Sequence, residues 1–210
     1  MSTDPRTDVP VTGPVEGELA GTYRGWRVEI RRSLDADVRD ELHALYERAF
    51  GPLRTLAAAR HVLTRAEFDE EMTAPTVDKY VALTADGTVA GLSTFTNDLS
   101  TVPWISPEYY AHRYPGPAAR GAVYYLGITL TDPAHRRTGA FEAVQEAVKA
   151  RLIAEDAVCV WDMCAANVEA GFADAISRFV GDRAVVAPTV VDTQHYFAAD
   201  FDRTTPGGTP

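Results

Sequence analysis

Basic residues are scarce in this chain, and long apolar runs are missing. Lysine and arginine number 20 against 30 aspartates and glutamates, which leaves a formal net charge of −10 over 210 residues. Nucleic acids and anionic membranes are bound through clustered positive charge, so we expect neither as a partner. No apolar run approaches the roughly 20 residues of a membrane span, and residues 1–15 lack the apolar stretch of a signal peptide. We therefore expect a cytoplasmic protein.

Cysteine and several catalytic motifs are scarce as well. The two cysteines, Cys159 and Cys164, lie in one apolar run, and their spacing is not that of metal ligands. On a strand they would point to opposite faces, which excludes a bridge between them, so we expect buried thiols. The sequence has no Gly-x-Ser-x-Gly elbow, no complete phosphate-loop motif and no His/Asp/Glu cluster with metal spacing. We expect no metal site.

The composition indicates one domain between two tails. Hydrophobic residues make up 46% of the chain, enough for a packed core. Residues 1–22 are rich in Thr, Pro, Asp and Gly, with almost no large apolar residue, and residues 203–210 are similar. Both segments are predicted to be flexible tails, which leaves a single domain over residues 23–202.

Along this domain the hydrophobic pattern alternates between strand-like and helix-like segments. Strands are predicted for residues 26–31, 79–84, 89–96, 123–131, 157–163, 184–191 and 194–198. Helices are predicted for residues 35–50, 53–62, 139–154 and 167–180, with a short acidic helix opened by a capping box at Thr64 and Glu67. This order indicates an α/β (α+β) fold in which a mixed, partly parallel twisted sheet of about seven strands is flanked by about four helices.

The stretch that follows residue 131 has the chemistry of an anion site. Arg136 and Arg137 precede Thr138 and Gly139, and a helix is predicted to begin at once. A helix N-terminus offers unpaired backbone N–H groups and partial positive charge, and glycine lets a bulky anion approach closely. These residues fit a phosphate or pyrophosphate cradle. An ordinary capped turn with two solvated arginines fits them equally well.

Together with the order of elements, this loop resembles the GNAT superfamily of acyl-CoA-dependent N-acyltransferases. Residues 131–141 follow the family's pattern Val-x-Pro-x-x-Arg/Gln-x-x-Gly-x-Gly/Ala without a gap. Thr131 departs from it at a usually apolar position, and Phe141 departs where a small residue is usual. The resemblance implies that acetyl-CoA, or another acyl-CoA, binds with its pyrophosphate on one run of residues, namely Arg136, Arg137, Thr138, Gly139, Ala140 and Phe141.

Two further parts of the CoA site follow from the resemblance. The family's Asn near the pantetheine arm corresponds to Asn167, for which a plain helix N-cap is an equal and compatible interpretation. The end of the strand over residues 123–131 is implied to pair with the pantetheine amides through the backbone of Thr129, Leu130 and Thr131. Gly127 in this strand indicates either a bulge that splays the strand or simple packing space.

The groups that move protons match the family least well. Many members place a Tyr late in the helix after the fifth strand, four residues before a glycine, as the acid that protonates the leaving CoA thiolate. In this sequence that position holds Ser177, a poor acid, and no Tyr lies in residues 167–180. Some members carry a general-base Glu on the fourth strand, and the corresponding residue is Tyr125. A phenol is a weak base at neutral pH, although it can relay a proton or donate a hydrogen bond. Tyr125 is our first expectation for the proton-handling group, ahead of Ser177.

Residues 97–121 form a long aromatic insertion between two predicted strands. Long loops in compact domains are usually functional or disordered, and the aromatic content argues against disorder. In the family this region borders the acceptor pocket. We therefore expect the wall of that pocket to include Trp104, Tyr109, Tyr110, His112 and Tyr114. A satellite hydrophobic cluster or a dimer contact is the alternative.

The resemblance implies a GNAT-type N-acetyltransferase that moves an acetyl or other short acyl group from CoA to a primary amine of a small molecule or a protein. Two alternatives stay open: a variant that uses a longer acyl chain, and a non-catalytic CoA-binding domain that acts as a sensor or assembly partner. A mononucleotide-binding domain is less well supported, because residues 30–35 contain no glycine for a phosphate-binding first turn. A homodimer also stays open.

Overall fold

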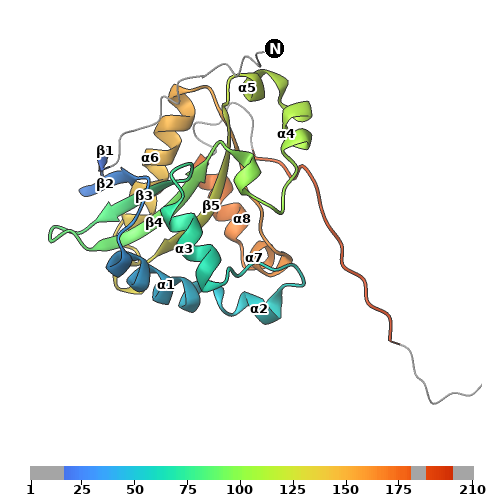
Figure 1. Cartoon of the computed structure of the whole chain (residues 1–210), viewed down its shortest axis with the longest axis horizontal. Helices are drawn as coiled ribbons and strands as arrows, with labels where there is room; N and C mark the ends of the chain where they lie inside the picture. The colour runs from blue at the N-terminus through green and yellow to red at the C-terminus, as the bar shows by residue number, and fades with distance from the viewer. Residues whose placement is uncertain (1–16, 181–187, 201–210) are drawn as a thin grey trace, which may run out of the picture.

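The strands of the protein pair in the order in which they occur in the chain. The computed structural model describes residues 17–180 and 188–200, and within them six strands form one sheet in the order β1-β2-β3-β4-β5-β6 (Figure 1). All neighbours are antiparallel except β5 and β6, which run parallel. The predicted mixed, partly parallel sheet is confirmed. The strands are β1 (Glu18–Tyr23), β2 (Trp26–Arg31), β3 (Asp78–Leu83), β4 (Val89–Thr96), β5 (Val123–Thr131) and β6 (Val158–Val160).

The structure differs from the prediction near both ends of the chain. Residues 18–22, assigned from their composition to the N-terminal tail, belong to β1, which pairs with β2. An edge strand that is largely exposed needs little apolar surface, so its hydrophobic pattern is weak. Residues 194–198 form no strand, so that prediction is wrong. The strand expected over residues 184–191 lies partly outside the described residues, as does the rest of both predicted tails.

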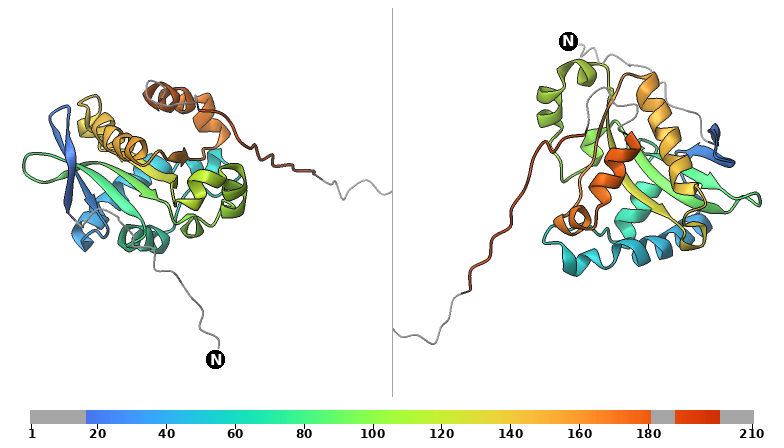
Figure 2. Two further views of the ribbon diagram at one scale, coloured as in Figure 1. Left: turned by 90° about the horizontal axis from the view of Figure 1, so that it is seen from above. Right: turned by 180° about the vertical axis from the view of Figure 1, so that it is seen from behind.

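Helices cover both faces of the sheet. Helix α6 (Ala140–Ala154) packs on one face, and α1 (Ala36–Phe50) and α3 (Arg65–Thr73) pack on the other (Figure 2). With α8 (Phe172–Val180), these are the longer helices of the described residues. Among the described residues, none of the helices is both long and apolar enough to span a bilayer. The shorter segments are α2 (Leu53–Leu56), η1 (Leu99–Thr101), α4 (Pro107–Arg113), α5 (Pro115–Ala119), η2 (Pro133–His135) and α7 (Ala165–Glu169).

The buried apolar side chains divide into three clusters. The first lies between the sheet and the pair α1 and α3, where Phe68 and Met72 are fully buried. The second lies under α6, whose Ala140, Ala143 and Ala147 let the helix approach the strands closely. The third is smaller and joins the aromatic insertion to the start of β5 and to β6. The site described below follows β5, which contributes residues to all three clusters.

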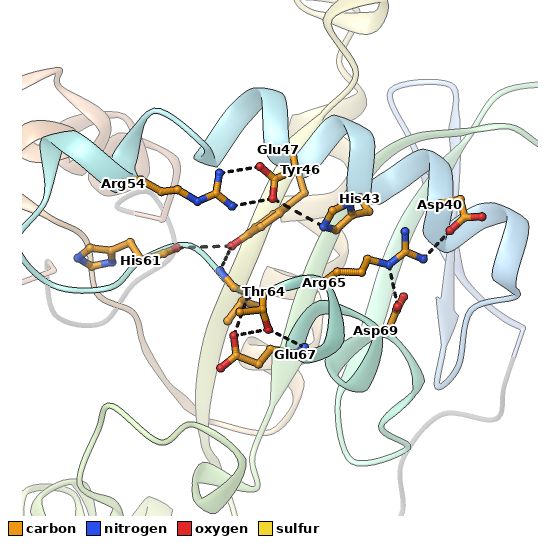
Figure 3. A network of polar contacts seen from close by, with 11 residues as sticks. Asp40, His43, Tyr46, Glu47, Arg54, His61, Thr64, Arg65, Glu67 and Asp69 are labelled. Atoms are coloured by element: carbon orange, nitrogen blue, oxygen red, sulfur yellow. Dashed lines mark hydrogen bonds and ion pairs between the residues drawn. The ribbon is translucent and has the colours of Figure 1, made fainter.

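Ion pairs join α3 to α1, and a capping box closes the N-terminus of α3 (Figure 3). Arg65, the first residue of α3, contacts Asp40 of α1 and pairs with Asp69 one turn later in its own helix. The predicted capping box is confirmed, because the Thr64 hydroxyl accepts from the Glu67 N–H at 3.3 Å and the Glu67 carboxylate accepts from the Thr64 N–H at 2.7 Å. These contacts determine where α3 begins and therefore which side chains its last turn presents to the sheet.

Two predicted helices are shorter or interrupted. The helix expected over residues 53–62 ends with Leu56. The helix expected over residues 167–180 divides into α7 and α8 at Gly171, which has a φ of 84°. The N-cap residue of α7 is Cys164, so the N-cap interpretation of Asn167 is wrong. Cys164 therefore lies outside β6. Both cysteines are free thiols.

Candidate functional site

The loop from β5 into α6 leaves the start of the helix open. Asp132 accepts a hydrogen bond from the Ala134 N–H at 2.7 Å, within a single 3-10 turn. Arg137 and Gly139 then adopt left-handed backbone conformations, with φ of 61° and 94°, which turn the chain into α6. Since α6 begins at Ala140, the amides of its first turn have no carbonyl partner within the helix. The loop therefore ends in backbone donors at the positive end of a helix dipole.

The side chains of this loop are also placed as an anion site requires. Arg136, Arg137 and Thr138 are exposed, so the guanidinium groups are available to a ligand, whereas the Thr138 hydroxyl donates to the His135 carbonyl at 2.6 Å. Phe141 exposes 37% of its surface, whereas Ala140 is fully buried and can offer only its amide. We call the segment from Arg136 to Phe141 the anion cradle.

A third arginine reaches the anion cradle from the far end of the sheet. Arg24 lies in the turn between β1 and β2, and carbons of its side chain lie 3.5 and 3.6 Å from the position that a Cβ on Gly139 would take. Next to it, Trp26 donates from Nε1 to the Thr138 carbonyl at 3.0 Å and packs edge-on against His135. Sequence reasoning missed Arg24, because no local pattern links this turn to a loop more than a hundred residues away. The contact adds a third positive charge beside the helix N-terminus.

One side of β5 has a free backbone edge that leads toward the anion cradle. The parallel pairing with β6 ends where Tyr125 lies opposite Val160. Beyond that point, none of the described strands pairs with β5 on this side. We call this side of residues 126–131 the open edge, and it begins at the centre of the sheet.

The register with β4 determines which peptide groups face the open edge. The Asp132 N–H donates to the Ala90 carbonyl at 2.9 Å, and hydrogen-bonded pairs alternate along an antiparallel ladder. Leu130 therefore directs its peptide groups toward β4. Thr129 and Thr131 direct theirs toward the open edge. Of the three residues expected to bind a pantetheine arm through the backbone, these two have the required orientation.

Gly127 marks a β-bulge at the start of the open edge. The pairing register shifts between Ser93 and Phe95, so that Thr94 alone lies opposite two residues of β5. The Thr94 hydroxyl accepts from the Ile128 N–H at 2.8 Å and lies 2.5 Å from the position of a Cβ on Gly127. Of the two roles left open for this glycine, the bulge is the one found.

Tyr125 is a buried residue at the edge of a partly exposed polar cluster. Its hydroxyl donates to Asp162 Oδ1, and Trp104 Nε1 lies 3.0 Å from that hydroxyl and 3.1 Å from the same carboxylate oxygen. On the other side, His61 Nδ1 lies 3.8 Å from Asp162 Oδ2. Burial, and then the charge of Asp162, raise the pKa of Tyr125 well above its ordinary value. The phenol therefore stays protonated and donates a hydrogen bond to Asp162. Of the roles expected for Tyr125 as the proton-handling group, donating or relaying a proton fits these surroundings better than accepting one.

Sequence reasoning missed Asp162. It lies two residues beyond the end of β6, and 38% of its side chain is exposed. A lone aspartate after an apolar strand carries no motif. Only the parallel pairing of β5 and β6 places its carboxylate against Tyr125, and that pairing is a tertiary feature.

Two of the predicted wall residues lie in this neighbourhood. Trp104 is half exposed and packs edge-on against Tyr125. Tyr110 packs in the third cluster, and burial together with the charge of Asp162 raises its pKa. These rings place aromatic surface next to a carboxylate that solvent can reach.

The other predicted wall residues have different contacts. Tyr109 donates to the Val191 carbonyl at 2.9 Å. Tyr114 packs in the third cluster and accepts from Arg113 Nε at 3.3 Å. His112 is exposed on the last turn of α4. The insertion thus also forms the satellite hydrophobic cluster that we considered as the alternative.

The remaining predicted site residues lie on α7 and α8. Ser177 is partly buried on α8, which lies on the same side of the sheet as α6 (Figure 2). Asn167 is partly buried within α7. Within the described part of the chain, neither side chain has a hydrogen bond to Tyr125 or Asp162.

No family model matches this sequence, and no curated protein matches it. Solved structures match at low identity. An aminoglycoside acetyltransferase from an uncultured soil metagenomic sample, in complex with sisomicin, is 11% identical with a TM-score of 0.47, over 82% of this chain and 97% of that one. A Trypanosoma brucei acetyltransferase is 16% identical with a TM-score of 0.40, over 79% and 99%. An integron cassette protein from the mobile metagenome of V. cholerae is 15% identical with a TM-score of 0.44, over 82% and 93%. Because these identities are low, we infer function from the residues of this chain.

Proposed function

We propose that this protein transfers an acetyl or other short acyl group from CoA to a primary amine of a small molecule or a protein. The observation that carries the proposal is the open edge of β5, which leads from the bulge at Gly127 to the anion cradle. At about 3.3 Å per residue, the strand from Gly127 to Thr131 spans roughly 13 Å. An extended ligand that carries amides and ends in a diphosphate would therefore find backbone partners and then a helix N-terminus along one path.

The anion cradle suits a pyrophosphate in charge as well as in shape. Arg136 and Arg137 are exposed in the loop, and Arg24 packs over Gly139. Charge-assisted hydrogen bonds to phosphate are worth about 1.5–3 kcal/mol each, more than neutral ones. Three arginines beside free helix amides favour a ligand with more than one negative charge.

The other end of the open edge suits the reaction with an amine. A bound acyl-CoA supplies a thioester carbonyl carbon as the electrophile. Trp104 and Tyr110 offer aromatic faces, and the exposed part of the Asp162 carboxylate attracts an ammonium group. Tyr125 and Trp104 hold that carboxylate in place through two hydrogen bonds. Holding the amine and the thioester in the reactive orientation can lower the barrier by up to about 7–11 kcal/mol, so positioning is a large part of the proposed catalysis.

Calorimetric titration with CoA tests the cradle. The variant Arg24→Ala/Arg136→Ala/Arg137→Ala should bind CoA at least a hundredfold more weakly, because each lost charge-assisted contact costs roughly tenfold or more. Arg48→Ala, an exposed arginine on α1 that lies on the other face of the sheet, is the matched control. An unchanged dissociation constant in the triple variant would contradict the cradle.

Release of free thiol from acetyl-CoA tests the transfer itself. Putrescine, benzylamine and lysine methyl ester are suitable first acceptors, because each carries a primary amine. Thiol release that depends on the amine, together with the acylated amine in a mass spectrum, is the expected result. Tight CoA binding without thiol release in any of these reactions would contradict acyl transfer to these amines and favour the non-catalytic alternative.

A further inference from the structure

A carboxylate from α3 lies over the bulge in β5. Phe68 and Met72 are buried on one side of α3. Glu71 lies on the same side, because it follows Phe68 by about one helical turn. Its Oε1 lies 3.5 Å from the position that a Cβ on Gly127 would take. The side chain is partly buried and forms a hydrogen bond with Thr94, the residue opposite the bulge.

Because Gly127 has no side chain, the Thr94 hydroxyl fills the space that a Cβ would need, and the Glu71 carboxylate lies beside it, close to the backbone of β5. The ring of Tyr125 borders the same space, since its Cε1 lies 3.6 Å from the same Cβ position. The open edge begins at this point. A thioester that extends along the open edge from the anion cradle would therefore end beside Glu71.

The groups around Glu71 come from four elements. Lys79 of β3 acts on it through space and donates from Nζ to the carbonyls of Arg32 and Ala74 at 2.8 and 2.7 Å. Thr94 of β4 and Tyr125 of β5 flank Glu71. Tyr46 of α1 is close enough that the charge of Glu71 contributes to raising the pKa of its hydroxyl. Burial raises the pKa of Glu71, and the hydrogen bond with Thr94 and the charge of Lys79 only partly offset that rise. A carboxyl group of raised pKa is better matched to proton transfer near neutral pH than an ordinary glutamate.

We propose that Glu71 is the general base that takes the proton of the acceptor amine. The proposal rests on the proposed function. In the balanced step, the ammonium of the acceptor gives one proton to the Glu71 carboxylate, and the freed nitrogen lone pair forms a bond to the acyl carbon. The carbon–sulfur bond breaks, its electron pair stays on sulfur, and the second proton of the nitrogen ends on the thiolate. The products are an amide and free CoA, and Glu71 returns its proton to solvent.

The test compares Glu71→Gln with Glu70→Gln, an exposed neighbour on the same helix. Glutamine keeps the size and a hydrogen-bonding oxygen for Thr94 but cannot accept the proton. We expect Glu71→Gln to lower kcat by about 10²–10⁴-fold with an unchanged CoA dissociation constant. We expect Glu70→Gln to behave like the parent. The melting temperature of Glu71→Gln should not fall, because the substitution removes a carboxylate whose charged form burial disfavours.

The dependence of the rate on pH separates a base from a structural residue. In the parent the rate should level off above the pKa of Glu71. In Glu71→Gln it should keep rising about tenfold per pH unit until the amine itself loses its proton, so the two profiles converge at high pH. Glu71→Asp should restore the shape of the parent profile at a lower rate.

Two results would overturn the role of Glu71 while leaving acyl transfer intact: a Glu71→Gln rate within threefold of the parent, or a rate lowered by one constant factor at every pH. Failure of the proposed function is recognised separately, in the parent protein, by absent CoA binding or absent thiol release.

Discussion

Gly127→Ala tests whether the bulge in β5 is as tightly filled as the structure shows. The new Cβ would lie 2.5 Å from the Thr94 hydroxyl oxygen, a separation that side-chain carbons essentially never adopt. Thr94 cannot easily move, because it accepts the Ile128 N–H at 2.8 Å. If Thr94 turns away, a buried amide loses its partner at a cost of about 1–3 kcal/mol, and overpacking adds a similar amount.

The expected loss of unfolding free energy is therefore about 2–6 kcal/mol. The usual gain from replacing glycine, about 0.4–1 kcal/mol through the unfolded chain, is too small to offset it. For a chain of this length, such a loss lowers the melting temperature by about 5–15 °C. Differential scanning calorimetry on the parent and the variant measures it directly.

Gly91→Ala is the matched control for this prediction. Gly91 lies in β4 of the same sheet, and its Cβ would meet nothing nearer than the Leu130 carbonyl oxygen at 3.6 Å. That variant should melt within a few degrees of the parent. The combination Gly127→Ala/Thr94→Ala should lose less stability than the two single losses added, because the second change removes the obstructing atom. A Gly127→Ala protein that melts at or above the parent temperature would refute the reasoning.

Three further predictions address the anion cradle, Tyr125 and the start of α3. Gly139→Val should abolish the thermal stabilisation by acetyl-CoA, because a β-branched side chain at a φ of 94° strains the turn and crowds the helix amides. Gly139→Asn is the control and should fold normally, because asparagine tolerates this conformation. A full ligand-induced shift of the melting temperature in Gly139→Val would place the anion elsewhere. Tyr125→Phe should lower kcat by less than about tenfold with an unchanged CoA dissociation constant, because the phenol stays protonated and only positions Asp162. A loss of about 10²–10⁴-fold in kcat would instead make Tyr125 an acid–base group. Ser177→Ala is the comparison variant in the same kinetic assay. Thr64→Ala should lower the free energy of unfolding, measured with urea, by about 1 kcal/mol through loss of the capping box. An unchanged urea midpoint would show that the cap adds nothing beyond the ion pairs of α3.

The sequence by itself was sufficient where a few neighbouring residues decide the structure. The capping box at Thr64 depends on a residue only three positions away. The loop before α6 is local in the same sense, because Gly139 turns the chain directly into the helix. Such features need no knowledge of the rest of the chain, since their hydrogen bonds join residues within one turn.

Where distant segments meet, only the tertiary structure could decide. Arg24 reaches Gly139 because the twisted sheet and α6 bring the first hairpin over the cradle. Asp162 meets Tyr125 through the parallel pairing of β5 and β6, and Glu71 reaches the bulge because α3 packs across β3, β4 and β5. None of these three residues belongs to a motif in the sequence. A side chain gains its role from the groups that surround it, and for charged groups drawn from separate elements those surroundings exist only after the sheet and its helices have packed.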